Sequence, residues 1–291
     1  MSSRSQRRPS IGIVGPGNLG AALALALQAA GYRVKFLVVR STTALSARSR
    51  SLSRKLHADV LEIGKQPIKT ELVWITVPDD AIADVAHALA RTQEWKGKVV
   101  LHSSGALTSD ELLPLRKKGA AVASVHPMMT FVRGSAPAMA GVSFAIEGDA
   151  AALRLATSIV RDLGGDAFKI EKRNKVLYHV FGSFASPLVI ALMGSLEQVA
   201  RAAGIREARI RRVMEPLLRQ TLSNYLAQDA ASAFSGPLVR GDAATVRKHL
   251  AELRQLPEAR AVYIALARAA LNLLPVKNRA GLARELKAAR S

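Results

Sequence analysis

Three glycines near the start of the chain have the spacing of a dinucleotide-binding loop. They form the pattern Gly-x-Gly-x-x-Gly within Gly15-Pro16-Gly17-Asn18-Leu19-Gly20. The first glycine makes a tight turn, the second lets the backbone approach a pyrophosphate, and the third lets a helix pack closely. A strand-like run at 10–14 precedes the loop and a helix-like run at 18–30 follows it, which is the context this motif requires. We predict that these six residues bind the pyrophosphate; the alternative is a turn that only packs a helix.

The end of the second expected strand, at 33–39, indicates which dinucleotide binds. A site that prefers NAD has a carboxylate there to hold the ribose 2′-hydroxyl. This chain instead has Arg40, Ser41 and Thr42, and an arginine with neighbouring hydroxyls suits a 2′-phosphate. NADP is therefore the predicted cofactor. Val77 and Pro78 follow a later strand, and we predict that they lie along the nicotinamide half of the cofactor.

Polar residues also follow the next two expected strands, where ligands of doubly wound sheets bind. Ser103 and Ser104 offer two hydroxyls beside a glycine, and we predict that they bind substrate. His126 ends the following strand and is a candidate proton donor. The alternatives are a polar turn for the serines and a structural role for the histidine.

Lys175 and His179 are four residues apart, so on a helix they share a face. Such a pair can exchange protons with a substrate, and we predict that Lys175 is the general acid or base. The alternative is a surface lysine beside an interfacial histidine. Arg240 follows a turn at 235–237 and is a candidate ligand for an anionic substrate, while Asp242 is expected to cap the next helix.

The elements that must position these residues alternate between strands and helices as far as residue 170. This pattern predicts a Rossmann-type, doubly wound α/β sheet. The remaining segment lacks strand patterns and predicts an all-helical domain, beginning with one long helix at 171–203. The expected divisions are a disordered basic tail at 1–9, an NADP-binding domain at 10–170, and a helical substrate and dimerisation domain at 171–291.

Taken together, these motifs resemble a family of Rossmann-like oxidoreductase relatives with a helical C-terminal domain of poorly defined function. The resemblance spans about residues 10–255 and rests on the glycine loop together with His102-Ser103-Ser104-Gly105, His126-Pro127, Lys175-x-x-Tyr178-His179 and Gly236-Pro237-x-x-Arg240-Gly241-Asp242. The chain is more distantly similar to β-hydroxyacid dehydrogenases and pyrroline-5-carboxylate reductase. In the dehydrogenases a catalytic lysine is followed four residues later by asparagine, where this chain has His179. The resemblance implies that the helical domain forms a homodimer.

Composition limits the other functions. The chain has 291 residues and no cysteine, which excludes disulfides, thiolate metal sites and a cysteine nucleophile. We predict no metal site, no membrane span, and a cytoplasmic location. Lysine and arginine total 42 against 22 acidic residues, for a net charge of +20. With only 4% aromatic residues, a basic surface is more consistent with this balance than a nucleic-acid site.

The motifs favour an NADP-dependent oxidoreductase that transfers a hydride to or from a small polar, carboxylate-bearing substrate. A fold of this kind does not by itself establish catalysis. The alternative is therefore a non-catalytic NADP-binding sensor or scaffold, and nucleic-acid binding is the third and weakest hypothesis.

Overall fold

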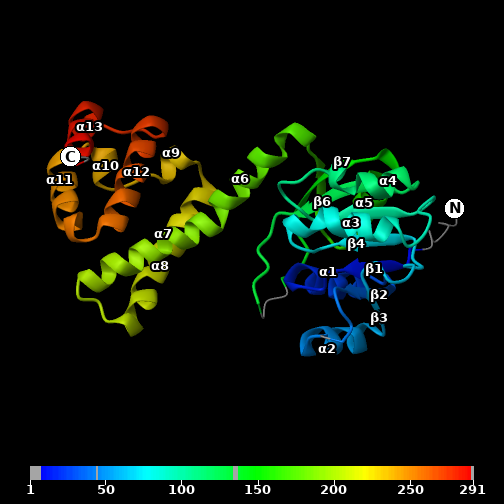
Figure 1. Cartoon of the computed structure of the whole chain (residues 1–291). Coiled ribbons are helices and arrows are strands. Elements are labelled where there is room, and N and C mark those ends of the chain that lie inside the picture. Colours follow the sequence, from blue (N-terminus) through cyan, green and yellow to red (C-terminus); the bar gives the residue numbers. More distant parts are fainter. Residues whose placement is uncertain (1–7, 44, 134–136, 290–291) are drawn as a thin grey trace, which may run out of the picture. The chain divides into compact units, whose positions relative to one another are not determined.

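The computed structural model describes residues 8–43, 45–133 and 137–289, and it divides the chain into two compact units (Figure 1). The first unit extends to Ser183 and the second begins at Phe184. Most of the predicted tail lies outside the described residues. Within them, Arg8 lies over the ring of Tyr32 and approaches Asp162 at 3.7 Å.

The first unit is built on one eight-stranded sheet with the order β3-β2-β1-β4-β5-β6-β7-β8. All neighbouring strands are parallel except β7, which is antiparallel to β6. This confirms the predicted Rossmann-type sheet. The strands are β1 (Ile11–Val14), β2 (Val34–Val39), β3 (Asp59–Glu62), β4 (Leu72–Ile75), β5 (Val99–His102), β6 (Ala121–Pro127), β7 (Ser143–Gly148) and β8 (Asp166–Lys169).

Helices cover both faces of the sheet because its central strands are buried on both sides. The larger apolar cluster joins one face to α1 (Asn18–Ala29), α2 (Ala47–Leu56) and α5 (Ala150–Asp162). The second cluster joins the other face to α3 (Ile82–Ala90) with η1 (Asp79–Ala81) before it, and to η2 (Ser109–Leu112) with α4 (Leu113–Lys117). The fully buried Trp74 and Trp95 belong to different clusters, so each face has one tryptophan in its core.

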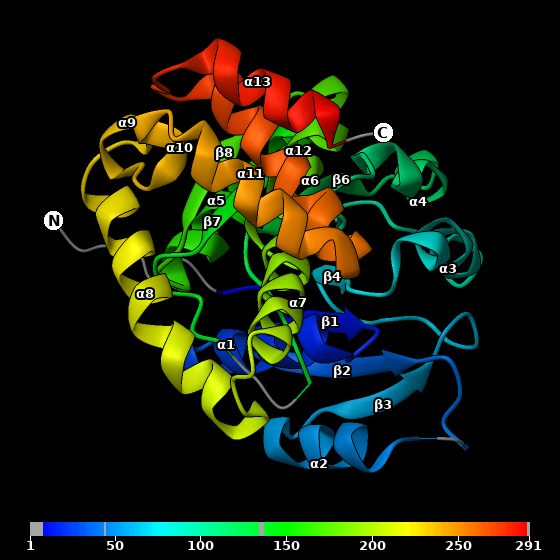
Figure 2. The ribbon, with the colours of Figure 1, turned by 90° about the vertical axis from the view of Figure 1, so that its left-hand side faces the viewer.

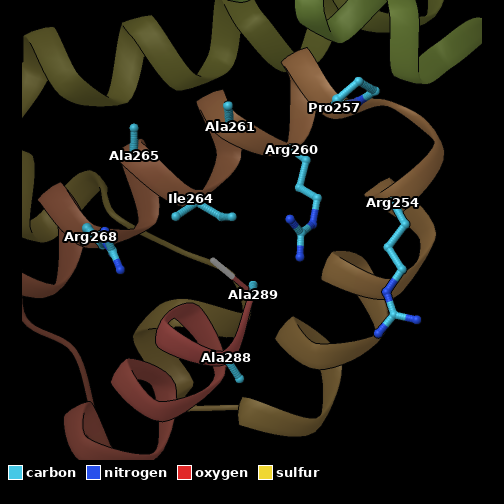
Figure 3. A pocket seen from close by; sticks show the side chains of 9 residues that line it. All are labelled: Arg254, Pro257, Arg260, Ala261, Ile264, Ala265, Arg268, Ala288 and Ala289. Carbon is cyan, nitrogen blue, oxygen red and sulfur yellow. The ribbon is translucent and has the colours of Figure 1, made fainter. Parts of the chain in front are cut away.

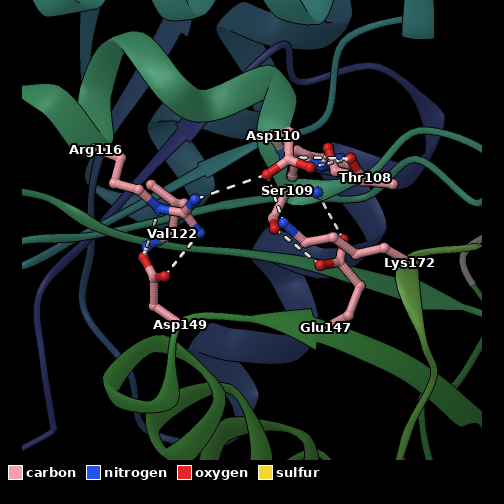
Figure 4. A network of polar contacts seen from close by, with 9 residues as sticks. Thr108, Ser109, Asp110, Arg116, Val122, Glu147, Asp149 and Lys172 are labelled. Carbon is pink, nitrogen blue, oxygen red and sulfur yellow. Dashed lines mark hydrogen bonds and ion pairs between the residues drawn. The ribbon is translucent and has the colours of Figure 1, made fainter.

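A network of charged and hydroxyl side chains ties the neighbouring strands β6 and β7 to η2 and α4 (Figure 4). Arg116 donates two hydrogen bonds to the carboxylate of Asp149, which also accepts from the backbone N–H of Val122. Glu147 is 5% exposed, and its two carboxylate oxygens accept from the backbone N–H and the hydroxyl of Ser109. Every buried oxygen of Glu147 therefore has a donor, which offsets the cost of its burial.

The first unit ends beyond the predicted boundary at residue 170. After η3 (Lys172–Asn174), helix α6 (Lys175–Ala185) begins with Lys175 and Tyr178 buried in this unit. The prediction of one helix at 171–203 is wrong, because the helix is interrupted at Ser186, before α7 (Pro187–Ala202). Pro187 disfavours helical geometry in the residue before it. Ser186 accordingly has φ −131° and ψ −80°.

The second unit is entirely helical within the described residues, as predicted (Figure 2). Its apolar core lies among α11 (Ala243–Glu252), α12 (Pro257–Leu273) and α13 (Arg279–Ala288), around Ile264, Leu271 and Leu282. The other elements are α8 (Glu207–Ala227), α9 (Ala230–Ala233), α10 (Pro237–Arg240) and η4 (Leu253–Gln255).

Helices α6 to α8 carry many apolar side chains that this single chain leaves exposed. No residue of α7 is buried, and Ile210 alone is buried in α8. By length and composition, segment Lys172–Ala202 is also able to cross a membrane, although the helix is interrupted at Ser186. The prediction of no membrane span therefore stays a prediction.

Candidate functional site

The glycine loop leaves β1 and enters α1 as the motif predicts. Gly15 has φ +81°, and its N–H donates to the carbonyl of Val38 at 2.9 Å. A Cβ at Gly20 would lie 2.4 Å from the hydroxyl oxygen of Thr76, so this glycine permits the close contact of α1 with the sheet. A Cβ at Gly17 would meet only the Gly15 carbonyl oxygen, at 4.0 Å. The space beside Gly17 is therefore open to a ligand.

A cavity of about 860 Å³ lies beside this loop. Seven of the residues predicted to bind the cofactor line it: Gly15, Pro16, Gly17, Arg40, Ser41, Val77 and Pro78. Its remaining lining was not predicted: Val39, Leu45, Ser46, Ser49, Ile63, Thr76, Ala81, Asp84, Val85 and Ala88. Ser46 caps α2, Ser49 belongs to it, and Ile63 follows β3; neither of these two elements was predicted from the sequence. The hydroxyls of Ser46 and Ser49 join Ser41 beside Arg40 at the same cavity.

Three other predicted cofactor residues, Asn18, Leu19 and Gly20, lie outside the cavity lining. Asn18 accepts a hydrogen bond from Arg48 at 2.6 Å and donates one to the carbonyl of Phe131. Arg48 is thus bound within the protein. Thr42 donates weakly to Glu62, whose carboxylate also lies 3.9 Å from Lys65 and does not line the cavity.

The two serines after β5 are buried, and their hydroxyls are bound differently. Ser104 donates to the carboxylate of Asp79 at 2.7 Å and accepts from the N–H groups of Ala106 and Leu107. Its hydroxyl is therefore fully used in fixing the turn, and Asp79 binds that serine instead of capping the following helix. The Ser103 hydroxyl accepts from the indole N–H of Trp74 at 2.8 Å, which leaves its own proton available.

His102 fixes the same turn from inside the sheet. Its Nδ1 accepts from the N–H of Ser104, so its Nε2 carries the proton and donates to the carbonyl of Thr108 at 3.0 Å. Burial, and secondarily the charge of Lys175, lowers the pKa of His102 to about 3. The ring is neutral at physiological pH.

His126 and His179 both lie against Gly105, on the side where a side chain would project. A Cβ at Gly105 would come within 2.9 Å of His126 Nε2 and 2.8 Å of His179 Cδ2. His126 Nδ1 lies 2.8 Å from the hydroxyl oxygen of Tyr178. Burial, followed by the charges of Lys175 and His179, lowers the pKa of His126 to about 4, and burial raises the pKa of Tyr178 to about 12. Imidazole and phenol are therefore both neutral.

The side chain of Lys175 lies at the ends of the same strands, β5 and β6. Its ammonium donates to the carbonyl of Ser104 at 2.9 Å and to the hydroxyl of Ser124 at 2.5 Å, and its side chain has no exposed surface. Burial lowers its pKa to about 8, against the opposing effect of Glu147 and Asp79. The first unit thus brings together Ser103, Ser104, His126, Lys175 and His179. The contributions of Tyr178, Ser124 and Gly105 were not assigned from the sequence, because their partners are distant along the chain.

Arg240 lies in the second unit, exposed at the end of α10. Asp242 caps α11 as predicted, accepting from the N–H of Thr245 at 3.0 Å. The role of Arg240 as a substrate ligand stays a prediction.

Two family models together cover most of the chain. Residues 1–127 match the Rossmann-like domain, and residues 142–270 match a domain of unknown function, DUF2520. Among curated proteins, none matches this chain in sequence.

Solved structures share the fold at low sequence identity. A Bacteroides fragilis protein provisionally named an NADP oxidoreductase aligns with a TM-score of 0.75 and 19% identity, covering 90% of this chain and 97% of its own. A pyrroline-5-carboxylate reductase from Coxiella burnetii aligns at 0.57 and 16%, covering 90% and 98%. An imine reductase from Myxococcus stipitatus, in complex with NADP⁺, aligns at 0.62 and 18%, covering 91% and 94%, and a variant of it is in complex with NAD⁺.

These matches confirm the resemblance to Rossmann-like oxidoreductase relatives and to pyrroline-5-carboxylate reductase as a likeness of fold. The chain thus matches a Rossmann-like domain model that is followed by a DUF2520 domain model.

Proposed function

We propose that this protein is an NADP-dependent oxidoreductase that transfers a hydride to or from a small, polar, carboxylate-bearing substrate. The observation that carries the proposal is the open space at Gly17, beside a cavity lined by Arg40 and hydroxyl groups. The names of the structural neighbours, an NADP oxidoreductase and NADP⁺-bound imine reductase, support the same cofactor.

The residues around the loop fit a dinucleotide phosphate. The backbone at Gly17 begins α1, so unpaired N–H groups and the positive end of the helix dipole face the open space. Arg40 and the hydroxyls of Ser41, Ser46 and Ser49 would hold the 2′-phosphate. Because the carboxylate of Glu62 is turned toward Thr42 and Lys65, it does not occupy the position of a ribose ligand.

The histidines at Gly105 supply the proton chemistry. A bound NADPH supplies a hydride to a carbonyl or imine carbon, and the adjacent oxygen or nitrogen then needs a proton. We assign the hydroxyl proton of Tyr178 to the bond with His126 Nδ1, which leaves Nε2–H of His126 as the donor on the Gly105 side. As the Nε2 proton leaves, the hydroxyl proton of Tyr178 moves to Nδ1, so that no imidazolate forms and the proton is finally lost from Tyr178. His179 is exposed beside it and can replenish the proton. The free proton of the Ser103 hydroxyl orients the substrate.

The role we propose for Lys175 differs from the general acid or base that the sequence predicts. Because its ammonium has no exposed surface, we propose that it holds the Ser104 carbonyl and keeps His126 neutral, without contacting the substrate. Lys175 is then a positioning residue, and His126 and His179 are the groups that exchange protons.

The test is turnover of NADPH with a panel of 2-oxo acids, 3-oxo acids and cyclic imino acids. We expect His126→Asn to lower kcat about 100-fold, the lower end of the usual contribution of a general acid. His87→Asn, on the exposed side of α3, is the control and should leave kcat unchanged. Full activity of His126→Asn would contradict the assigned role. NADPH binding without turnover across the panel would favour the sensor hypothesis.

A further inference from the structure

The second unit contains a cavity of its own, of about 730 Å³ (Figure 3). Its walls come from η4, from one side of α12 and from the end of α13, and it shares no residue with the cavity beside the glycine loop. Three arginines line it, Arg254, Arg260 and Arg268, with Pro257, Ile264 and small alanines between them. The proposed function assigns no role to any of these residues.

The spacing of the arginines places two of them on the same wall of the cavity. Arg260, Ile264 and Arg268 follow one another at intervals of four residues on α12, so they lie along one face of the helix. Figure 3 shows Arg260 extending from α12 into the space beside Ala289, with Arg254 flanking that space from the neighbouring segment. Among the described residues, no acidic side chain lines the cavity, so those residues concentrate positive charge there.

The pairing of these arginines is incomplete. Nε of Arg260 is buried without a hydrogen-bond partner among the described residues. Arg268 makes one long bond, 3.5 Å, to the carbonyl of Leu286. Elsewhere in this unit arginines do pair with carboxylates, as Arg247 does with both oxygens of Glu285. A guanidinium keeps its charge at any physiological pH, so its buried N–H needs an acceptor from outside the described chain.

We propose that this cavity binds the phosphate group of a small phosphorylated ligand. Guanidinium groups bind phosphate with two parallel hydrogen bonds, and the three around this cavity carry more positive charge than is needed to neutralise a phosphate monoester, which has a charge of about −2. The apolar surfaces of Pro257, Ile264 and Ala261 would contact the body of the ligand. The arginines line a concave cavity that also has apolar walls, which favours a small ligand over the extended backbone of a nucleic acid.

The test is calorimetric titration with inorganic phosphate and pyrophosphate, at saturating NADP⁺ so that the glycine loop is filled. We expect Arg260→Gln to weaken binding at least tenfold and Arg254→Gln to weaken it severalfold. Arg254 is exposed, so its replacement does not depend on refolding of the core. Arg212→Gln removes the same charge from the exposed surface of α8 and should leave the affinity unchanged.

Three outcomes would overturn the proposal. Equal affinity in wild type and Arg260→Gln would place the phosphate elsewhere, including at the glycine loop if NADP⁺ fails to bind there. Binding that appears only after residues 290 and 291 are removed would identify the carboxyl end of the chain as the occupant. Displacement of pyrophosphate by a short DNA duplex, itself sensitive to Arg260→Gln, would assign the surface to nucleic acid. Failure of the proposed oxidoreductase function alone would leave the effect of Arg260→Gln intact.

Discussion

The burial of Lys175 makes the stability of the first unit depend on pH in a defined window. The pKa of this lysine is about 8 in the folded protein and 10.5 at its ordinary value. Between these values the unfolded chain binds more protons, so the contribution of Lys175 to stability rises with pH. Below pH 8 the free-energy cost of burying the charged ammonium of Lys175 is fully present, and above pH 10.5 that cost is gone. The total change is on the order of 3 kcal/mol.

A comparison of wild type with Lys175→Met isolates this contribution. The variant cannot titrate at this position, so the stability of wild type relative to the variant should increase from pH 7.5 to pH 10. Urea unfolding followed by tryptophan fluorescence is the appropriate measurement, because Trp74 and Trp95 are both buried in the first unit. Parallel pH profiles for the two proteins would show that the ammonium of Lys175 is not desolvated.

At the scale of elements, two glycines in the loop between β1 and α1 have different roles. Gly20 permits close packing of the helix, and Gly17 leaves room for the ligand. Gly20→Ala would place a methyl group 2.4 Å from Thr76 Oγ1, and we expect a loss of about 1–3 kcal/mol from this overpacking. Gly17→Ala meets no atom closer than 4.0 Å and should cost less than about 1 kcal/mol. The added methyl group would nevertheless occupy the space of the pyrophosphate. We therefore expect Gly17→Ala to unfold like wild type and to lose NADPH binding; retained binding would contradict the role of the loop.

Much of this element could be predicted from sequence, since its glycines, flanking strand and helix are contiguous. The end of the sheet was also predictable, because the alternation of strands and helices stops near residue 170 and the last strand, β8, ends at Lys169. Helix α2 was missed because its sequence, ARSRSLSRKL, is polar with only three buried residues. Strand β3 was missed because its sequence, DVLE, has a carboxylate at each end and only one buried residue. The bonds of Lys175 to Ser104 and Ser124 depend on segments 71 and 51 residues apart, which no local pattern reports.

At the scale of the whole molecule, we propose that a second copy of the chain packs against the exposed apolar side chains of α7 and α8 and buries them. Many large apolar side chains of α7 and α8 are exposed, and three of them, Ile190, Leu217 and Leu226, are each at least 68% exposed. Stable homodimers bury surfaces of this apolar kind. We expect sedimentation to show a dimer, and Leu217→Glu with Leu226→Glu to produce monomers. Arg212→Glu is the control on the same helix. A wild-type monomer, or a wild-type dimer that survives both glutamates, would contradict this assignment.

The central claim is that the first unit binds NADP through Arg40 and the glycine loop. The most direct test is calorimetric titration of wild type and Arg40→Ala with NADPH and NADH. We predict that wild type prefers NADPH, and that Arg40→Ala loses affinity for NADPH by about tenfold or more while its affinity for NADH is unchanged, because only NADPH carries the 2′-phosphate. Equal affinity of wild type for the two cofactors, or binding of neither, would contradict the account.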